Sequence, residues 1–184
     1  MAVAKPQLPA LRFAAIFGQK TASIDWGRDR AVESWGPSVL ESEDFEFDQT
    51  NYYRDTMGEG LHKRLVAFEE LIDPTELVAS KLLANQLESE FRETYPGTVM
   101  RPVNIDPGYL TEAKVVLATM KDRDHRLYLG DGVFGEVTLY FQLPGKWVDS
   151  RWTYPDYRRP EYHEFFFRCR DHLRQCLQEL ARAT

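Results

Sequence analysis

The stretch LRFAAIFG, from Leu11 to Gly18, is a short apolar run that ends in glycine. Such a run is typical of a strand that is buried on both faces of a sheet, so it predicts a central strand. The chain has 184 residues, 43% of them hydrophobic, which is enough to build one core around that strand. We expect a single domain over residues 1–184, with residues 1–10 as a flexible N-terminal arm.

Helical patterns follow this strand. The segment Asp73–Glu93 has the clearest start, because an aspartate N-cap, a proline in the first turn and Glu76 can satisfy the free amides there. Its polar stripe, formed by Lys81, Asn85 and Glu88, could border a cleft. Further helices are predicted over Ser23–Gly36, over Thr111–Lys121 and over Pro160–Ala183, which carries an apolar stripe suited to packing on a sheet.

Extended patterns fill the intervals between the helices. Strands are predicted in Val39–Asp48, Leu61–Leu71 and Arg101–Asp106, and a hairpin in His125–Phe141 that turns at the glycines 130 and 132. The order strand, helix, strand, strand, helix, strand predicts an α+β fold with a mixed, mostly antiparallel sheet. We expect a ferredoxin-like βαββαβ core, an added β-hairpin and a C-terminal helix packed on the sheet.

The first candidate site is NIDPGYLTEAKVVLATMKDRDHRLYLG, from Asn104 to Gly130. A turn at Pro107-Gly108 would place Asp106 and Tyr109 at a strand end just before a helix, where free amides favour anions. The alternative is structural: Asp106 would cap the turn and Tyr109 would pack.

The same stretch also contains basic side chains. Lys114 and Lys121 would share one side of the predicted helix, and His125 and Arg126 open the next strand. These side chains could hold a phosphate or carboxylate while Asp106 or His125 moves a proton as the catalytic group. The alternative is that the cations form a solvated face.

Two loops are further candidates for ligand binding. In TNYYRDTMGEGLHKR, Thr50–Arg64, the glycines permit a close backbone approach, and the loop could close over a small ligand through its aromatic and basic side chains. In WTYPDYR, Trp152–Arg158, the rings would pin the last helix to the sheet, and Arg158 would bind ligand or pair with Asp156. The candidate side chains of the first loop are Tyr52, Tyr53, Arg54 and Arg64.

Composition argues against several classes of function. A net charge of −6 gives no general attraction to nucleic acid, and no segment approaches the roughly 20 apolar residues that span a bilayer, so neither nucleic acid nor membrane is an expected partner. Because no zinc spacing is present, no metal site is predicted, and the cofactor stays unassigned. Cys169 and Cys176, about 10 Å apart along one helix, would be reduced thiols of a cytoplasmic protein.

Five motifs resemble an uncharacterised bacterial family, domain of unknown function 4416. They are FDQTNYYRDTMGEGL, FEELIDPTEL, NIDPGYLTEAKVVLATMKDRDHRLYLG, GEVTLYF and WTYPDYR. The resemblance runs from Phe13 to the last helix and implies a free-standing single-domain protein. It carries over no activity, fold or catalytic residue.

Two functions from different classes are compatible with these patterns. In the first, a cleft of lysine, arginine, tyrosine and aspartate side chains binds, and could act on, a small phosphate- or carboxylate-bearing metabolite such as a nucleotide. Its polar side chains should converge on one pocket. In the second, a non-catalytic module binds a protein partner or forms a homo-oligomer through a sheet edge. Its polar side chains should scatter, and a flat apolar patch should appear.

Overall fold

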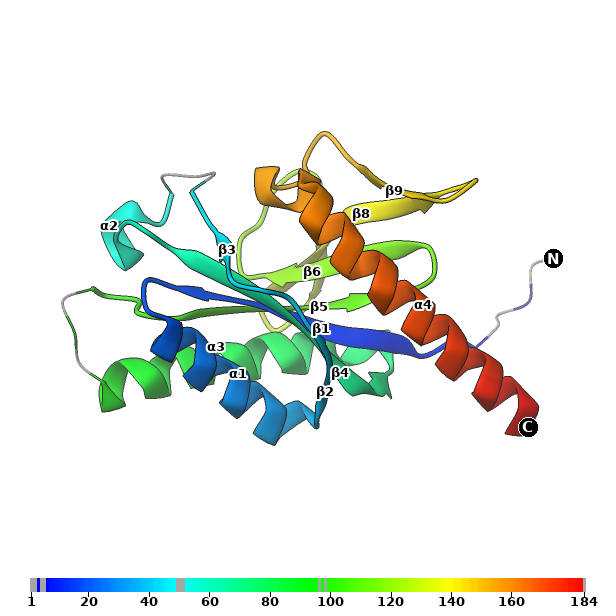
Figure 1. The fold of residues 1–184 in the computed structure, drawn as a ribbon, viewed down its shortest axis with the longest axis horizontal. Helices are drawn as coiled ribbons and strands as arrows, with labels where there is room; N and C mark the ends of the chain where they lie inside the picture. Colours follow the sequence, from blue (N-terminus) through cyan, green and yellow to red (C-terminus); the bar gives the residue numbers. More distant parts are fainter. Residues whose placement is uncertain (1–2, 4–5, 49–51, 96, 98, 184) are drawn as a thin grey trace.

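A computed structural model describes residues 3, 6–48, 52–95, 97 and 99–183 of the chain. Figure 1 shows helices on both faces of a twisted sheet, with α1 and α3 along one face and α4 across the other. In chain order the elements are β1 (Ala10–Gly18), α1 (Thr21–Trp35), β2 (Ser38–Glu41), β3 (Phe45–Glu46), α2 (Arg54–Met57), β4 (His62–Ile72), the 3-10 helix η1 (Pro74–Glu76), α3 (Leu77–Thr94), β5 (Asn104–Leu110), β6 (Lys114–Thr119), β7 (Leu127–Gly130), β8 (Val133–Gln142), β9 (Lys146–Asp149), the 3-10 helix η2 (Pro155–Arg158) and α4 (Pro160–Ala183).

The described strands form one antiparallel sheet in the order β2-β4-β1-β5-β6-β8-β7, to which β3 is added beside β4 and β9 beside β8. The fold is therefore α+β with a mostly antiparallel sheet, as predicted. The predicted sequence of strand, helix, strand, strand, helix, strand corresponds to β1, α1, β2, β4, α3 and β5. Its four strands are neighbours in the sheet, in the order β2-β4-β1-β5.

The strand β1 is central, and all of its residues are buried. Its alternate side chains divide the core, because neighbouring residues of a strand point to opposite faces. Phe13 and Ala15 belong to the cluster under α4, whereas Ala14 and Ile16 belong to the cluster under α1 and α3. The prediction of a strand buried on both faces is confirmed.

Three of the helix predictions are also confirmed, because α1, α3 and α4 form where helices were predicted over Ser23–Gly36, Asp73–Glu93 and Pro160–Ala183. At the start of the η1–α3 segment, the side chain of Asp73 accepts a hydrogen bond from the Thr75 amide, and Glu76 accepts one from the Asp73 amide. The helix α4 places Tyr162, Phe166 and the rest of its buried stripe against the sheet.

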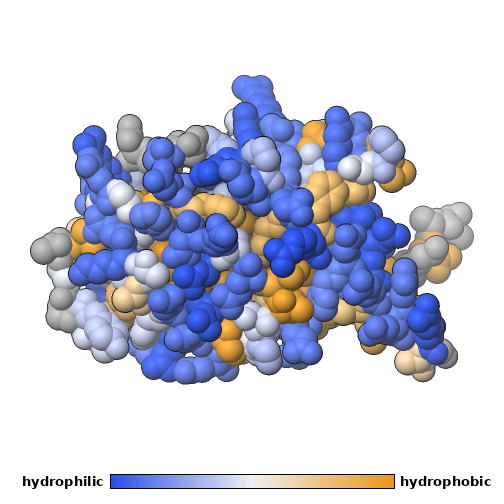
Figure 2. All heavy atoms as spheres, in the orientation of Figure 1, coloured by the Kyte–Doolittle hydropathy of each residue, from blue (hydrophilic) through white to orange (hydrophobic). Residues whose placement is uncertain are grey.

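The molecular surface seen in Figure 2 is mainly hydrophilic, and its apolar side chains lie in separate groups.

The helix predicted over Thr111–Lys121 is wrong, because most of this segment is the strand β6. Valine is favoured in strands, and residues 115–118 pack on both faces of the sheet. Val115 and Leu117 face the cluster under α4, whereas Val116 and Ala118 pack beside α3. The hydroxyl of Thr111 accepts hydrogen bonds from two amides of the β5–β6 turn, so it caps a turn and not a helix.

Pro107-Gly108 does not turn the chain, because both residues lie inside β5. Proline is tolerated there, since β6 pairs with β5 only from Gly108 to Leu110 and leaves Pro107 beside an open edge. Glycine is required for packing. A Cβ at Gly108 would lie 2.5 Å from Cζ of Phe13 and 2.5 Å from the carbonyl oxygen of Val116.

We therefore expect Gly108→Ala to lower the free energy of unfolding by about 1–3 kcal/mol, the usual cost of overpacking a core. Urea denaturation measures this change. Gly97→Ala is the matched control, because a Cβ at Gly97 meets only the Tyr95 carbonyl at 4.0 Å. Equal stabilities of the two variants would contradict the packing role of Gly108.

Three smaller predictions concern the N-terminal arm, the two cysteines and membrane-spanning helices. The flexible arm expected over residues 1–10 lies partly outside the described residues, and Ala10 already begins β1. Both Cys169 and Cys176 are free cysteines. Of the helices described, none has the length and apolar character needed to cross a membrane.

Candidate functional site

The strands β5 and β6 separate along the sheet, and a cavity lies where they part. β5 pairs with β1 from Asn104 to Leu110 but with β6 only from Gly108 onward, although β6 stays paired with β8 as far as Thr119. The cavity has a volume of about 390 Å³, within the usual range for small-molecule sites. Asn104 and Asp106 line it from β5, and residues 117–121 line it from β6 and the turn that follows.

Side chains of α3 replace β6 along the open edge of β5. The carboxylate of Glu88 accepts a hydrogen bond from the Ile105 amide at 2.8 Å, and Nζ of Lys81 donates to the Ile105 carbonyl at 3.2 Å. Both backbone groups of Ile105 are thus satisfied without pairing to β6. Arg101 in turn holds Glu88 with two hydrogen bonds, at 2.6 and 3.0 Å.

Asp106 is the carboxylate on the floor of the cavity. Nζ of Lys81 lies 2.9 Å from its Oδ1, and no described residue forms a hydrogen bond with its second oxygen. The Lys81 side chain is 4% exposed and the Asp106 side chain 28%, so the pair turns its negative member toward the cavity. Burial by itself would raise the pKa of Asp106, but the charge and hydrogen bond of Lys81, with Arg101 and Lys63, hold that pKa below its ordinary value.

Burial is the largest cause of the pKa shifts of Glu88 and Tyr53 near the cavity. It raises the pKa of Glu88, against the opposing charges of Lys81 and Arg101. It also raises the pKa of Tyr53 well above its ordinary value, and the charge of Asp106 adds to this effect. Tyr53 is therefore a neutral hydrogen-bond donor at physiological pH, whereas Asp106 is an acceptor.

A second buried pair supports the cavity from β4. Nζ of Lys63 lies 2.7 Å from Oδ2 of Asp156, and both side chains are buried. The ammonium group also lies 3.5 Å from the ring centre of Phe47 and 4.6 Å from that of Phe17. Lys63 is opposite Phe17, and Phe17 is opposite Asn104, so the three form one row across β4, β1 and β5. Nδ2 of Asn104 is buried and has no hydrogen-bond partner in the described part of the chain.

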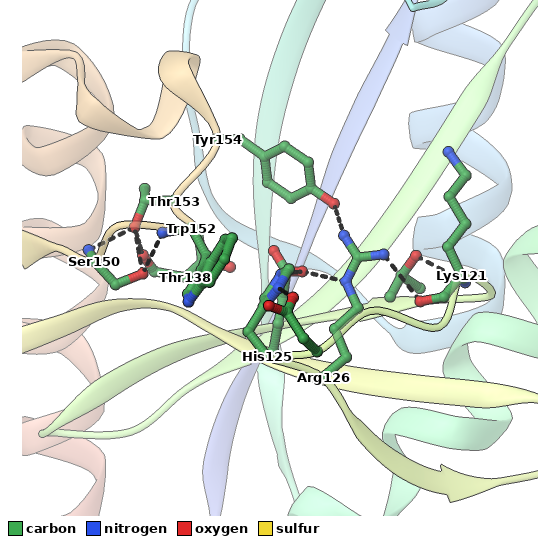
Figure 3. A network of polar contacts seen from close by, with 11 residues as sticks. Lys121, His125, Arg126, Thr138, Ser150, Trp152, Thr153 and Tyr154 are labelled. Carbon is green, nitrogen blue, oxygen red and sulfur yellow. Dashed lines mark hydrogen bonds and ion pairs between the residues drawn. The ribbon is translucent and has the colours of Figure 1, made fainter.

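Arg126 connects three walls of the cavity (Figure 3). Its Nε donates to Oε2 of Glu136 at 2.6 Å, one terminal nitrogen donates to the Tyr154 hydroxyl at 2.6 Å, and the other to the Lys121 carbonyl at 2.9 Å. Because the guanidinium is planar and rigid, these bonds fix the residue before η2, the strand β8 and the loop after β6 relative to each other.

Positive charge is in excess at the cavity. Among the described residues, six cationic side chains line it, and four of them, Lys63, Lys81, Arg101 and Arg126, are paired with carboxylates. The other two, Lys121 and Arg123, form no ion pair with any residue that the structure describes. Nζ of Lys121 lies 3.8 Å from the ring centre of Tyr52, and its hydrogen bond with the Tyr52 hydroxyl lowers the pKa of that group.

Five of the predicted site residues line this cavity, and six lie elsewhere. Tyr52, Tyr53, Asp106, Lys121 and Arg126 are brought together. His125 lies behind the cavity wall, with its ring stacked on Trp152 and its Nε2 3.3 Å from Glu136. Tyr109 packs in the cluster beside α3, and Lys114 is exposed at the far end of β6 from Lys121.

The remaining predicted arginines are engaged in ion pairs outside the cavity. Arg54 pairs with Glu59, and Arg64 bridges Asp25 and Asp44 at 2.8 and 2.6 Å. Arg158 lies 3.4 Å from Asp149, so the pairing with Asp156 that the sequence suggested is wrong. Asn51, in the same loop as Tyr52, lies outside the described residues.

Several lining residues carry no local signal in the sequence. The polar stripe of α3 was predicted to border a cleft, and two of its three residues, Lys81 and Asn85, line the cavity, whereas Glu88 does not. Lys63, Arg101 and Asp156 occur in segments that resemble ordinary strands and turns, and they reach the cavity only through the register of the sheet. In the part of the chain that is described, no cluster of three or more histidine, cysteine, aspartate or glutamate residues could hold a metal ion.

The lowered pKa of Asp106 predicts a pH dependence of stability. Because the pKa is lower in the folded state than the value near 3.9 of an unfolded aspartate, its contribution is fully present above that value and is lost as pH falls through the folded pKa. Wild type should exceed Asp106→Asn in unfolding free energy near neutral pH, and the difference should shrink below about pH 4. Urea denaturation at a series of pH values tests this. A difference that stays constant would contradict ionised Asp106 as the partner of Lys81.

Comparison with known proteins identifies a family whose description states no activity. The family model described as Domain of unknown function (DUF4416) matches residues 8–173. The chain belongs to this family. The matched segment begins just before β1, ends within α4 and includes every residue that lines the cavity. No curated protein and no solved structure matches the chain.

Proposed function

We propose that the protein binds a small metabolite with a phosphate or carboxylate group, such as a nucleotide, in the cavity between β5 and β6. One observation carries the proposal: Lys121 and Arg123 line this cavity without a carboxylate partner among the described residues, in a chain whose net charge is −6. Lysine and arginine side chains that are left uncompensated at a cavity attract anions, and arginine can bind phosphate or carboxylate with two hydrogen bonds.

The walls of the cavity suit a ligand with a planar part. Tyr52, Tyr53, Tyr154 and Phe47 contribute aromatic rings, and Leu117 contributes an aliphatic wall. Aromatic faces bind planar groups by stacking, while a few polar groups fix their orientation. Of the two side chains predicted to move a proton, Asp106 lines the cavity and His125 does not, so we assign that role to Asp106. With two free cysteines in the chain, we place this binding activity in the cytoplasm.

The test is thermal unfolding of the full chain with nucleotides, sugar phosphates and carboxylic acids. A ligand at 100 times its dissociation constant adds about 2.7 kcal/mol of stability. Each of Lys121→Ala and Arg123→Ala should then weaken binding by about tenfold or more, because a hydrogen bond to a charged group contributes about 1.5–3 kcal/mol. The control is Lys114→Ala, since Lys114 is exposed at the other end of β6. Equal affinities in all three variants would contradict the proposed site.

A second candidate function, pairing of two copies through a sheet edge, has its own observation. The strand β7 ends the sheet and exposes Leu127, Tyr128 and Leu129, which are 74%, 64% and 44% exposed. Such an edge is a template for another strand unless charge or proline blocks it. Analytical ultracentrifugation measures the oligomeric state. A wild-type dimer that dissociates in Leu127→Lys supports this function, and a monomeric wild type contradicts it.

A further inference from the structure

We infer that the cavity selects a guanine nucleotide, with the base hydrogen-bonded to Asp106 and the phosphate against Lys121 and Arg123. This inference rests on the proposed function, because it assumes an anionic ligand in the same cavity. It adds the chemical class of the ligand and the group that recognises it. The three residues lie on the cavity wall, Asp106 in β5 and the two cations in the turn after β6.

The carboxylate of Asp106 disfavours a ligand that is anionic along its whole length. Its lowered pKa keeps it ionised at neutral pH, and its second oxygen has no hydrogen-bond partner among the described residues. An ionised carboxylate accepts hydrogen bonds and repels other anions. A ligand that fills the cavity must therefore be bipolar, with its anionic group at Lys121 and Arg123 and with hydrogen-bond donors facing Asp106.

Lys81 fixes the orientation of this carboxylate. It donates to Oδ1 of Asp106 and also to the Ile105 carbonyl, so the position of its ammonium group is set by two bonds. Each carboxylate oxygen can accept about two hydrogen bonds, so Oδ1 keeps a lone pair besides the free Oδ2. The two oxygens together suit a ligand edge with two adjacent donors.

Among planar groups of nucleotides, guanine presents such an edge. Its N1–H and its 2-amino group are adjacent donors that one carboxylate can bind together. Hypoxanthine has N1–H but lacks the 2-amino group, and adenine places an acceptor at N1, which the carboxylate would repel. Rings for stacking are available at Tyr52, Tyr53 and Tyr154, and stacking is tolerant of which base is bound. The choice among bases would therefore come from Asp106.

The experiment is isothermal titration calorimetry of the wild-type chain with the 5′-monophosphates of guanosine, inosine and adenosine at one salt concentration. The three ligands share the ribose and phosphate, so they differ only at the base. We expect guanosine monophosphate to bind about tenfold or more tightly than inosine monophosphate, because one hydrogen bond to a charged acceptor is lost. Adenosine monophosphate should bind most weakly.

Asp106→Asn supplies a reversal of specificity. The amide keeps the shape of the side chain but replaces one acceptor with a donor. Xanthosine monophosphate carries a carbonyl where guanine carries the 2-amino group, so it should bind Asp106→Asn more tightly than guanosine monophosphate does. Circular dichroism checks the fold of the variant, because Lys81 loses its charged partner there. Should the variant not fold, the wild-type series still decides.

The outcomes separate this inference from the proposed function. Equal binding of the three purine nucleotides, weakened by Lys121→Ala, overturns the role of Asp106 in selection and leaves the anion site standing. Binding of a sugar phosphate or carboxylic acid without binding of any nucleotide also overturns only the inference. If no compound binds in either the thermal unfolding test or the calorimetry series, the inference and the proposed function are both overturned.

Discussion

Replacing Lys63 with methionine should lower the free energy of unfolding by about 3–5 kcal/mol, the usual cost of removing one partner from a buried ion pair. The substitution keeps an apolar side chain of similar length between Phe17 and Phe47, so little packing is lost. What remains is the carboxylate of Asp156, 2.7 Å from the former ammonium group and 3% exposed. An uncompensated charge at such a depth is costly because water cannot solvate it.

Replacing the other partner, in Asp156→Asn, should lower the free energy of unfolding by less. Lys63 would then keep the faces of Phe17 and Phe47, and cation–π contacts stabilise a desolvated ammonium group. In the double variant neither charge is buried alone, so its loss of stability should be smaller than the sum of the two single losses. Urea denaturation of the four proteins closes this cycle. Additive losses would show that Lys63 and Asp156 do not stabilise each other.

Local patterns were sufficient to predict the elements that carry their own signals. The apolar run of β1, the capping residues at Asp73 and Glu76, and the stripe of α4 each depend on residues close together in the chain. The segment of β6 shows the limit. Thr111 and the residues after it look like a helix start, but the valines that follow pair with β5, the strand just before them, and with β8, the second strand after them. The pattern of the segment alone does not show this pairing.

The candidate site was predictable to a similar degree. Tyr52 stood out in a predicted loop, Asp106 at a predicted strand end and Lys121 on a predicted helix, and all three line the cavity. The pair of Lys63 and Asp156 did not stand out, because its members are 93 residues apart. The cavity itself arises where β6 stops pairing with β5, and the sequence marks that point only through Pro107-Gly108, which was predicted to be a turn.

A similarly large effect is expected for Arg126→Ala, which should lower the free energy of unfolding by about 3–5 kcal/mol. The variant leaves Glu136 buried, 3% exposed, with the His125 ring at 3.3 Å as the remaining hydrogen-bond partner of its carboxylate among the described residues. It also frees the Lys121 carbonyl and the Tyr154 hydroxyl, two groups that Arg126 holds at the cavity. Stability and affinity for the anionic ligand should therefore fall together.

Two comparison variants make this result specific. Arg126→Lys keeps the charge but loses the planar fork, so it should lie between wild type and Arg126→Ala. Arg158→Ala removes an arginine whose ion pair with Asp149 is exposed, and such pairs contribute at most about 1 kcal/mol. Urea denaturation and calorimetry on the same protein samples measure both quantities. If Arg126→Ala costs no more than Arg158→Ala, the cavity walls are held by the packing of η2 and β8, and Arg126 does not position Lys121.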